Sequence, residues 1–334
     1  MTSKRMEDVT SASYNAIYST AAILDESDRG RLWMRGRDRA ALLHRLSTNA
    51  IEPLQPGQGT LTVLTTPIGR MIDLLRVYVL PDALLLETGS GHGAAILRHL
   101  RKNIFFNDQV TVADASLELG QIGVYGPQAS QVLRTIGLPT DIPRYGITSA
   151  QWAEHQIFVA RCEPMGGDGY TLYPHPTQVM AFMTALTNAG AVELDKNTAE
   201  IVRVEHGYPR FKHEITLDYI PLEADLWRAV SFHKGCYVGQ EIIARMESRG
   251  RIAKLLRGLR LSAAPESLPA KVMADGKEVG DLTSAVCSPR FGWIGLAYLR
   301  RAYAESGTTV TVFDRPATVC TLPFTMHEAT GMKE

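Results

Sequence analysis

Residues 233–241 gather side chains that could do chemistry around one cysteine, and they read HKGCYVGQE. A cysteine thiolate is both a nucleophile and a metal ligand, and a neighbouring ammonium group favours the thiolate form. Lys234 lies close before Cys236, and the flanking glycines allow backbone conformations that other residues resist. Cys236 could therefore be an accessible thiol that serves redox chemistry or contacts a metal, a cluster or a ligand. Alternatively, it is a loop cysteine without a function.

The stretch that follows, GQEIIARM, predicts a helix. Glu241 would lie in its first turn, where a carboxylate complements the helix dipole. Arg245 follows one turn later, so a surface ion pair with Glu241 accounts for both residues. Arg245 or Arg249 could instead bind a ligand carboxylate through two parallel hydrogen bonds.

Asp73 interrupts an apolar strand pattern, GRMIDLLRVYV. Alternation of side chains along the strand places Asp73 on the same face as Met71 and Leu75, so its carboxylate is expected to be buried. A buried carboxylate requires a partner or a function. Two interpretations stay open for Asp73, a binding or catalytic role and a structural hydrogen bond.

Glu205 lies near the end of a predicted helix, NTAEIVRVEHG. Asn197 is the expected N-cap, Glu200 completes a capping-box pair with it, and Gly207 ends the helix. Glu205 therefore falls in the last turn, where the helix dipole disfavours a carboxylate. Its position indicates a use other than helix stability.

The composition is that of a folded protein without overall charge. Of the 334 residues 45% are hydrophobic, and 35 basic side chains balance 35 acidic ones. The protein therefore has no overall positive electrostatic potential that would favour nucleic acid or an anionic membrane as a partner. The four cysteines form no CxxC pair and no zinc-binding pattern, which disfavours a metal site and suits a reducing cytoplasm. We find no secretory signal, no membrane-spanning apolar segment and no nucleotide-binding motif.

These candidate residues require elements that position them. Helical patterns are found in GRDRAALLHRLSTN and TQVMAFMTALTNAG, and TLTVLTTPIGRMIDLLRVYVL predicts two strands about a turn. After residue 251, short strands separated by turn residues predict a small antiparallel barrel or sandwich. We therefore expect an α+β protein with one region at 15–250 and an all-β domain at 251–330.

Four stretches resemble the folate-binding superfamily of the glycine-cleavage T-protein, the aminomethyltransferase. They are RLWMRGRDRAALLHRLSTN, TTPIGRMIDLLRVYV, IVRVEHGYPRFKHEIT with YIPLEADL, and GKEVGDLTSAVCSPRFGWIGLAYLRR. The resemblance implies two interleaved α+β domains and a C-terminal antiparallel β-barrel, arranged around a central channel that holds folate. It implies that Glu205 matches the carboxylate that contacts the pterin. Asp73 matches the catalytic aspartate of aminomethyltransferases, although the second acid of their pattern is Leu74 here.

Within the superfamily, KGCYVGQE is similar to the K-G-C-Y-x-G-Q-E signature of the YgfZ-type branch. Members of that branch bind tetrahydrofolate and support the assembly or repair of iron–sulfur clusters, whereas aminomethyltransferases carry a D-F-I-G form without a cysteine. The resemblance implies that Cys236 and Lys234 border the folate channel, with Tyr237 among the cofactor-binding residues. Arg245 is a candidate for binding the glutamate tail of folate.

Two main hypotheses follow. The first is a tetrahydrofolate-binding accessory protein for iron–sulfur enzymes, in which Lys234 activates the functional thiol of Cys236. Its partners would be folate and the client enzymes or assembly proteins, and the protein itself would be a cytoplasmic monomer. The second is a tetrahydrofolate-dependent aminomethyl- or methyltransferase that uses Asp73 as its catalytic carboxylate. A folate-binding regulator with neither role is a third alternative.

Overall fold

The computed structural model describes residues 12–248, 250 and 252–325. The chain divides into two compact units that alternate along the sequence. The first unit takes in the described residues up to Thr65, together with Asp73–Thr198 and Arg228–Val238. The second takes in Thr66–Ile72, Ala199–Trp227 and the described residues from Gly239 onward. The two units interleave and do not meet at a single point of the sequence. The predicted domain boundary at residue 250 stays a prediction.

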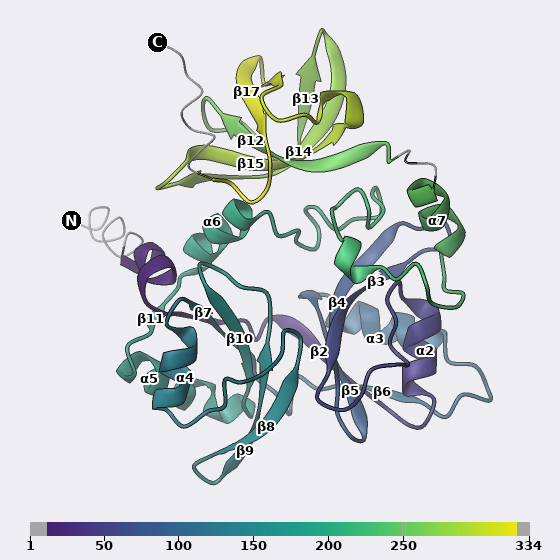
Figure 1. Cartoon of the computed structure of the whole chain (residues 1–334), viewed down its shortest axis with the longest axis vertical. Coiled ribbons are helices and arrows are strands. Elements are labelled where there is room, and N and C mark those ends of the chain that lie inside the picture. Colours follow the sequence, from purple (N-terminus) through teal and green to yellow (C-terminus); the bar gives the residue numbers. More distant parts are fainter. Residues whose placement is uncertain (1–11, 249, 251, 326–334) are drawn as a thin grey trace. The chain divides into compact units, whose positions relative to one another are not determined.

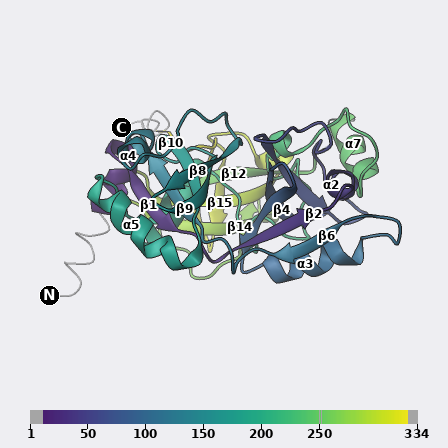
Figure 2. The same cartoon turned by 90° about the horizontal axis from the view of Figure 1, so that it is seen from below.

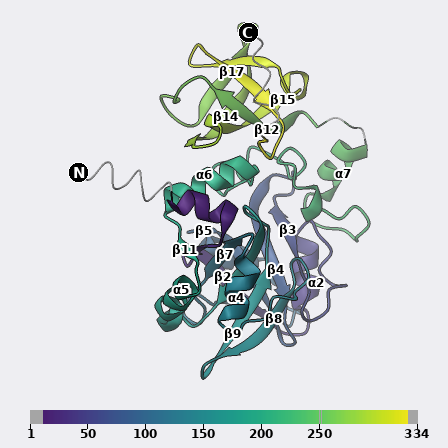
Figure 3. The same ribbon diagram turned by 60° about the vertical axis from the view of Figure 1, so that its left-hand side comes forward.

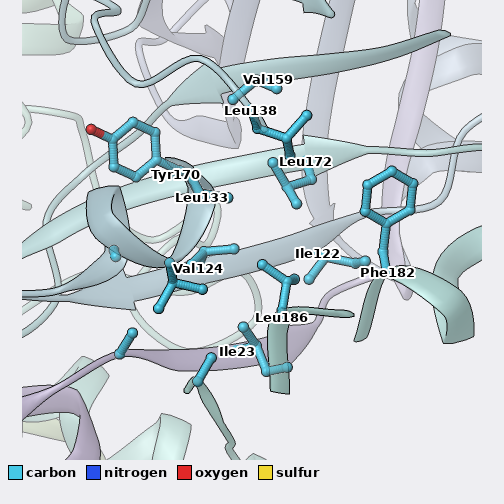
Figure 4. Close-up of a cluster of buried hydrophobic side chains, with 14 of the residues drawn as sticks. Ile23, Ile122, Val124, Leu133, Leu138, Val159, Tyr170, Leu172, Phe182 and Leu186 are labelled. Atoms are coloured by element: carbon cyan, nitrogen blue, oxygen red, sulfur yellow. The ribbon is translucent and has the colours of Figure 1, made fainter. Parts of the chain in front are cut away.

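The first unit contains a six-stranded sheet in the order β11-β1-β7-β10-β9-β8. All of its pairings are antiparallel except that of β1 with β11. The strands are β1 (Ala22–Asp25), β7 (Ile122–Gly126), β8 (Ile147–Trp152), β9 (His155–Arg161), β10 (Asp168–Tyr173) and β11 (Val192–Glu193). One face packs on helices α4 (Ala129–Thr135) and α5 (Val179–Asn188). Figure 4 shows this core, where Phe182 and Leu186 of α5 meet Ile23 and Ile122 of the sheet.

A second sheet of the same unit has five strands in the order β3-β4-β5-β2-β6. They are β2 (Arg29–Arg35), β3 (Gly59–Thr65), β4 (Met71–Val79), β5 (Ala83–Ser90) and β6 (Thr111–Asp114). Helix α3 (Gly93–Lys102) lies along this sheet next to β2 and β6 (Figure 2). Helix α2 (Arg39–Leu46), predicted from the pattern GRDRAALLHRLSTN, begins after β2 (Figure 1). It buries Leu42, Leu43 and Leu46.

The two sheets of this unit share a core. Trp33 and Leu85 of the five-stranded sheet pack with Ile147, Ala160 and Tyr173 of the six-stranded sheet. Trp33 also meets Phe158 edge-on, with ring centroids 6.3 Å apart. Strands β2 and β5 therefore present one face to helix α3 and the other to the opposing sheet.

The second unit is built on a closed six-stranded antiparallel barrel in the order β12-β15-β14-β13-β16-β17 (Figure 3). Its strands are β12 (Lys254–Leu261), β13 (Ala270–Ala274), β14 (Lys277–Ser288), β15 (Gly292–Arg300), β16 (Thr309–Val312) and β17 (Arg315–Cys320). The prediction of an all-β C-terminal domain is confirmed, and the fold is α+β with a C-terminal barrel. Short 3-10 turns lie at Pro176–Gln178, Trp227–Ala229 and Arg301–Tyr303.

Two helices are associated with the second unit, α6 (Lys196–His206) and α7 (Gln240–Ser248). The prediction that Asn197 caps α6 was wrong, because the carboxylate of Asp195 accepts the backbone N–H groups of Asn197 and Thr198 at 2.9 Å. Gly207 ends the helix with a left-handed φ of 71°, as predicted. Asp195 therefore satisfies the first backbone N–H groups of the helix, and Thr198 Oγ1 donates to the same carboxylate at 2.6 Å.

Buried Glu214 joins the residues after α6 to the barrel. Its carboxylate accepts the hydroxyl groups of Thr283 and Ser284 at 2.7 and 2.6 Å, and Arg203 pairs with it at 3.0 Å. These partners of the buried charge belong to the second unit, which accounts for the grouping of residues 199–227 with the barrel.

Candidate functional site

The segment that carries Cys236 is fastened to the C-terminal end of helix α2. The ammonium group of Lys234 donates hydrogen bonds to the main-chain oxygens of His44, Ser47 and Asn49, at 2.8 Å to Ser47 and 2.7 Å to Asn49. Carbonyl groups at a helix C-terminus have no partner within the helix and attract a cation. Burial lowers the pKa of Lys234 to about 8, which leaves the ammonium as the main form at neutral pH.

Three further contacts hold the two residues after the cysteine. Tyr237 is buried, and Lys234 lies over its ring at 5.0 Å from the centroid. The main-chain N–H of Val238 donates to Arg45 O at 3.1 Å, and Val238 O accepts from Thr65 Oγ1 at 2.6 Å. Cys236 itself is exposed. A free thiol is thus presented between anchored neighbours.

The three donors of Lys234 are directed at backbone carbonyls, so the geometry gives this lysine a helix-capping function. Activation of Cys236 by Lys234 stays a prediction that rests on their closeness in sequence. Tyr237, predicted to bind the cofactor, is an anchoring side chain in this geometry.

Beyond Val238 the chain enters the second unit through Gly239 and helix α7. Gly239 has a φ of +85°, and a side chain there would come within 2.7 Å of Thr66 O. Glu241 lies in the first turn of α7, and Arg245 pairs with it at 2.6 Å. Both side chains are largely exposed, so this pair is worth only about 0.3–0.5 kcal/mol and could yield to a ligand carboxylate. Arg249 lies outside the described residues.

Asp73 is completely buried on β4, on the face that its alternation predicts. Its carboxylate accepts the main-chain N–H of Leu74 on Oδ1 at 2.9 Å and that of Gly89 on Oδ2 at 2.9 Å. His92 Nδ1 lies 3.0 Å from the same Oδ2. The structural hydrogen bonds considered for Asp73 are therefore present, and a catalytic role stays a proposal.

Glu205 lies in the last turn of α6, as predicted, and its side chain is buried. Ser288 Oγ of β14 donates to its carboxylate, and its main-chain oxygen accepts from Phe324 N at 2.9 Å. A serine hydroxyl stabilises the charge that the helix dipole disfavours. Pterin binding by Glu205 stays a prediction.

A third group of charges was not predicted from the sequence. Arg76 projects from the opposite face of β4 and pairs with Glu87 at 2.8 Å and with Glu163 at 2.7 Å. The hydroxyl of Tyr173 donates to Glu87. Burial alone would raise the pKa of Glu163, but the Arg76 guanidinium outweighs burial and holds that pKa below its ordinary value. An arginine in a mainly apolar strand was the available signal.

The candidate residues therefore separate by unit. Asp73, Lys234, Cys236 and Tyr237 belong to the first unit. Glu205 and Arg245 belong to the second.

Across the part of the chain that the structure describes, no three histidine, cysteine, aspartate or glutamate side chains are grouped to hold a metal ion. Among the described helices, none is long and apolar enough to cross a membrane.

Known proteins share both parts of this architecture. A chloroplastic protein of Arabidopsis thaliana that is provisionally named a transferase is 32% identical over 307 residues, covering 89% of this chain and 69% of the relative. The aminomethyltransferase of Mycobacterium tuberculosis is 29% identical over 311 residues, covering 91% and 84%. The crystal structure of the glycine cleavage system aminomethyltransferase T from Bartonella henselae superposes with a TM-score of 0.85 at 21% identity, covering 95% of this chain and 89% of that one.

Family models cover nearly the whole chain. The GCVT N-terminal domain matches residues 2–234, which include Asp73 and Lys234. The glycine cleavage T-protein C-terminal barrel domain matches residues 254–325, which form the closed barrel described above. The chain therefore belongs to the glycine cleavage T-protein family.

Proposed function

We propose that this protein binds tetrahydrofolate and supports the assembly or repair of iron–sulfur clusters through the thiol of Cys236. The observation that carries the proposal is the presentation of an exposed thiol between two fixed neighbours, Lys234 on the α2 carbonyls and buried Tyr237. A thiol on an anchored backbone can meet a partner protein without first ordering a loop. The likeness of KGCYVGQE to the YgfZ-type signature supports the same function.

The ligand of this proposal is a reduced folate. Glu205 would accept hydrogen bonds from the pterin, and Arg245 would leave its exposed pair with Glu241 to bind the glutamate tail. Membership of the T-protein family supports a folate ligand. We propose a cytoplasmic monomer whose partners are client enzymes or assembly proteins, with neither nucleic acid nor membrane as a partner. The chloroplastic location of the Arabidopsis relative is a property of that protein.

The test compares Cys236→Ser with Cys287→Ser, because Cys287 is the other exposed free cysteine of the described chain. In cells that depend on this protein for iron–sulfur enzyme activity, Cys236→Ser should abolish that support and Cys287→Ser should preserve it. Calorimetric titration with tetrahydrofolate should show binding by both variants and weaker binding by Glu205→Ala. Full support of cluster enzymes by Cys236→Ser would contradict the proposal.

A second candidate function is a folate-dependent aminomethyl- or methyltransferase. It is favoured by Asp73, whose carboxylate accepts two main-chain N–H groups and lies 3.0 Å from His92 Nδ1. The resemblance of GRMIDLLRVYV to aminomethyltransferases matches Asp73 with their catalytic aspartate. A fixed carboxylate can stabilise positive charge that develops on a transferred one-carbon group. The similarity to the aminomethyltransferase of Mycobacterium tuberculosis supports this alternative.

The two candidates predict opposite patterns. A transferase should lose turnover in Asp73→Asn and keep it in Cys236→Ser, whereas the cluster-support function should show the reverse for cluster-enzyme activity. The measurement for the transferase is formation of methylene- or methyl-tetrahydrofolate from candidate aminomethyl or methyl donors. If Cys236→Ser alone is defective and no donor gives product, the transferase candidate is rejected.

A further inference from the structure

Two adjacent aromatic side chains face solvent in the connection between α3 and β6. Phe105 is 60% exposed, and Phe106 is fully exposed, at 104%. Single exposed apolar side chains are common on protein surfaces, so exposure alone does not mark a binding surface. This pair differs in two respects, because the backbone that carries it is held in place and adjoins the segment of the exposed thiol.

Asp108 and Arg45 fix the connection that carries the two phenylalanines. Asp108 Oδ2 accepts the main-chain N–H of Phe105 at 2.7 Å, and the main-chain N–H of Asp108 donates back to Phe105 O at 3.0 Å. The guanidinium of Arg45 pairs with the Asp108 carboxylate and lies over the Phe105 ring, 4.7 Å from its centroid. A backbone ordered in this way loses little conformational entropy when a partner covers its side chains.

Arg45 also joins this connection to the segment of the exposed thiol. Its main-chain oxygen accepts the N–H of Val238, two residues after Cys236, at 3.1 Å. Figure 2 shows the α3–β6 connection at the same end of the first unit as helix α2. With successive Cα atoms about 3.8 Å apart, these contacts place Cys236 within about 25 Å of the Phe105 ring. One partner's share of a standard interface, about 800 Å², is roughly 30 Å across. A single interface is therefore large enough to include both.

The charged residues beside the aromatic pair are mainly basic. Arg98, Arg101 and Lys102 of helix α3 are exposed. Asp108 is the acidic residue of the connection, and Arg45 neutralises it. Cations in the last turn complement the helix dipole, but the whole chain carries no net charge, so this excess of positive charge is local. Such a surface attracts a partner with acidic side chains.

We propose that Phe105 and Phe106 form a docking surface for the protein partner that Cys236 serves, a protein with an apolar pocket bordered by acidic side chains. The inference rests on the proposed cluster-support function. The aromatic side chains fill the pocket, the cations of α3 pair with its border, and the thiol is brought to the partner's surface. Buried aromatic side chains carry much of the binding energy of protein interfaces. The nearby thiol favours a protein over a membrane as the occupant.

The test uses the full-length protein in cells that depend on it for iron–sulfur enzyme activity. Phe106 is replaced by the photoreactive amino acid benzoylphenylalanine, and a thiol-directed cross-linker is attached to Cys236 in parallel. The control carries benzoylphenylalanine in place of Leu117, another exposed apolar residue of the first unit. Positions 106 and 236 should both be joined to the same partner protein, and position 117 should not. No product at position 106, a second copy of this chain, or different proteins at the two positions would overturn the inference.

The affinity for the purified cross-linked partner gives the second readout. Phe106→Ser should weaken binding about thirtyfold, the loss typical of a central aromatic residue, whereas Leu117→Ser should bind like the wild type. Lys102→Glu should weaken binding at low salt and have less effect at high salt. Since Phe106 is fully exposed, Phe106→Ser should keep the urea midpoint of the wild type.

The outcomes separate this inference from the proposed function. If Cys236→Ser abolishes support of cluster enzymes while Phe106→Ser keeps both that support and the partner affinity, the docking surface is rejected and the proposed function stands. Full support by Cys236→Ser rejects the proposed function and this inference with it. A membrane is tested by flotation with vesicles of phosphatidylcholine and phosphatidylserine. Flotation of the wild type that is lost in Phe106→Ser would assign the surface to a membrane and overturn the inference.

Discussion

Lys234 donates a 2.8 Å hydrogen bond to the main-chain oxygen of Ser47, so the KGCYVGQE motif closes the C-terminal end of helix α2. A second bond of the same ammonium group reaches Asn49 O at 2.7 Å. Lys234 therefore fixes the Cys236 segment against helix α2, and this contact contributes to the stability of the first unit. The same contact explains why a cation lies at this place in the motif.

Replacing Lys234 by methionine should lower the free energy of unfolding by about 2–3 kcal/mol, because part-buried carbonyl groups lose a charged donor. Urea unfolding of the purified protein measures the change. Lys102→Met, at an exposed lysine of α3, should change stability by less than about 0.5 kcal/mol. Equal stability of the two variants would exclude a capping role for Lys234.

Arg76→Met should be among the most destabilising substitutions of the first unit. It would leave the carboxylates of Glu87 and Glu163 without their shared cation, and breaking a buried ion pair in this way costs about 3–5 kcal/mol. Combining it with Glu87→Gln and Glu163→Gln should restore much of the loss, since no uncompensated charge would remain. Arg245→Met removes an exposed pair and should cost about 0.5 kcal/mol or less in the same urea experiment.

Glu163 should make the protein sensitive to acid. Its pKa is held below the ordinary value, so its ionised form stabilises the folded state above the unfolded pKa of about 4.3. That contribution is lost as the pH falls through the lower folded pKa. Urea midpoints measured across roughly pH 3–7 should therefore fall less steeply in Glu163→Gln than in the wild type. Glu241→Gln, whose carboxylate is 83% exposed, should follow the wild-type curve.

The elements were predictable from the sequence where one local pattern decides them. The spacing in TQVMAFMTALTNAG predicts a helix with one apolar face, and α5 buries Val179, Phe182 and Leu186 on that face. The turn-separated strands after residue 251 likewise form the barrel. Local periodicity is sufficient in both cases, because the apolar residues recur along the sequence with the same period as the buried positions of the helix or strand.

The site was less predictable, because its contacts join residues far apart in the sequence. Arg76 and Glu163 are 87 positions apart and meet only when two sheets pack face to face. His92 is 19 positions from Asp73, and their contact depends on the close approach of α3 to β2. A sequence pattern shows that Asp73 is buried but not which side chain covers it.

Gly239→Ala should destabilise the protein more than Gly276→Ala. Both glycines have a left-handed φ, of +85° and +69°, which costs another residue about 1–2 kcal/mol. Only at Gly239 would the added methyl group also meet backbone, at 2.7 Å from Thr66 O and 2.9 Å from Gly69 Cα. We expect losses of about 2–5 kcal/mol for Gly239→Ala and about 1–2 kcal/mol for Gly276→Ala in thermal or urea unfolding. Equal losses would show that the crowding around Gly239 relaxes freely.

The four cysteines should divide into two reactive and two protected thiols in the native protein. Cys236 and Cys287 are exposed, whereas Cys162 and Cys320 are buried. Burial raises the pKa of the Cys162 thiol to about 12, so its thiolate is scarce at neutral pH. A native titration with an aromatic disulfide reagent should therefore release two equivalents quickly, and Cys236→Ser should release one. Urea should expose the rest. Slow reaction of Cys236 in the folded protein would mean that its thiol is closed to a partner, and the cluster-support function would then lose the observation that carries it.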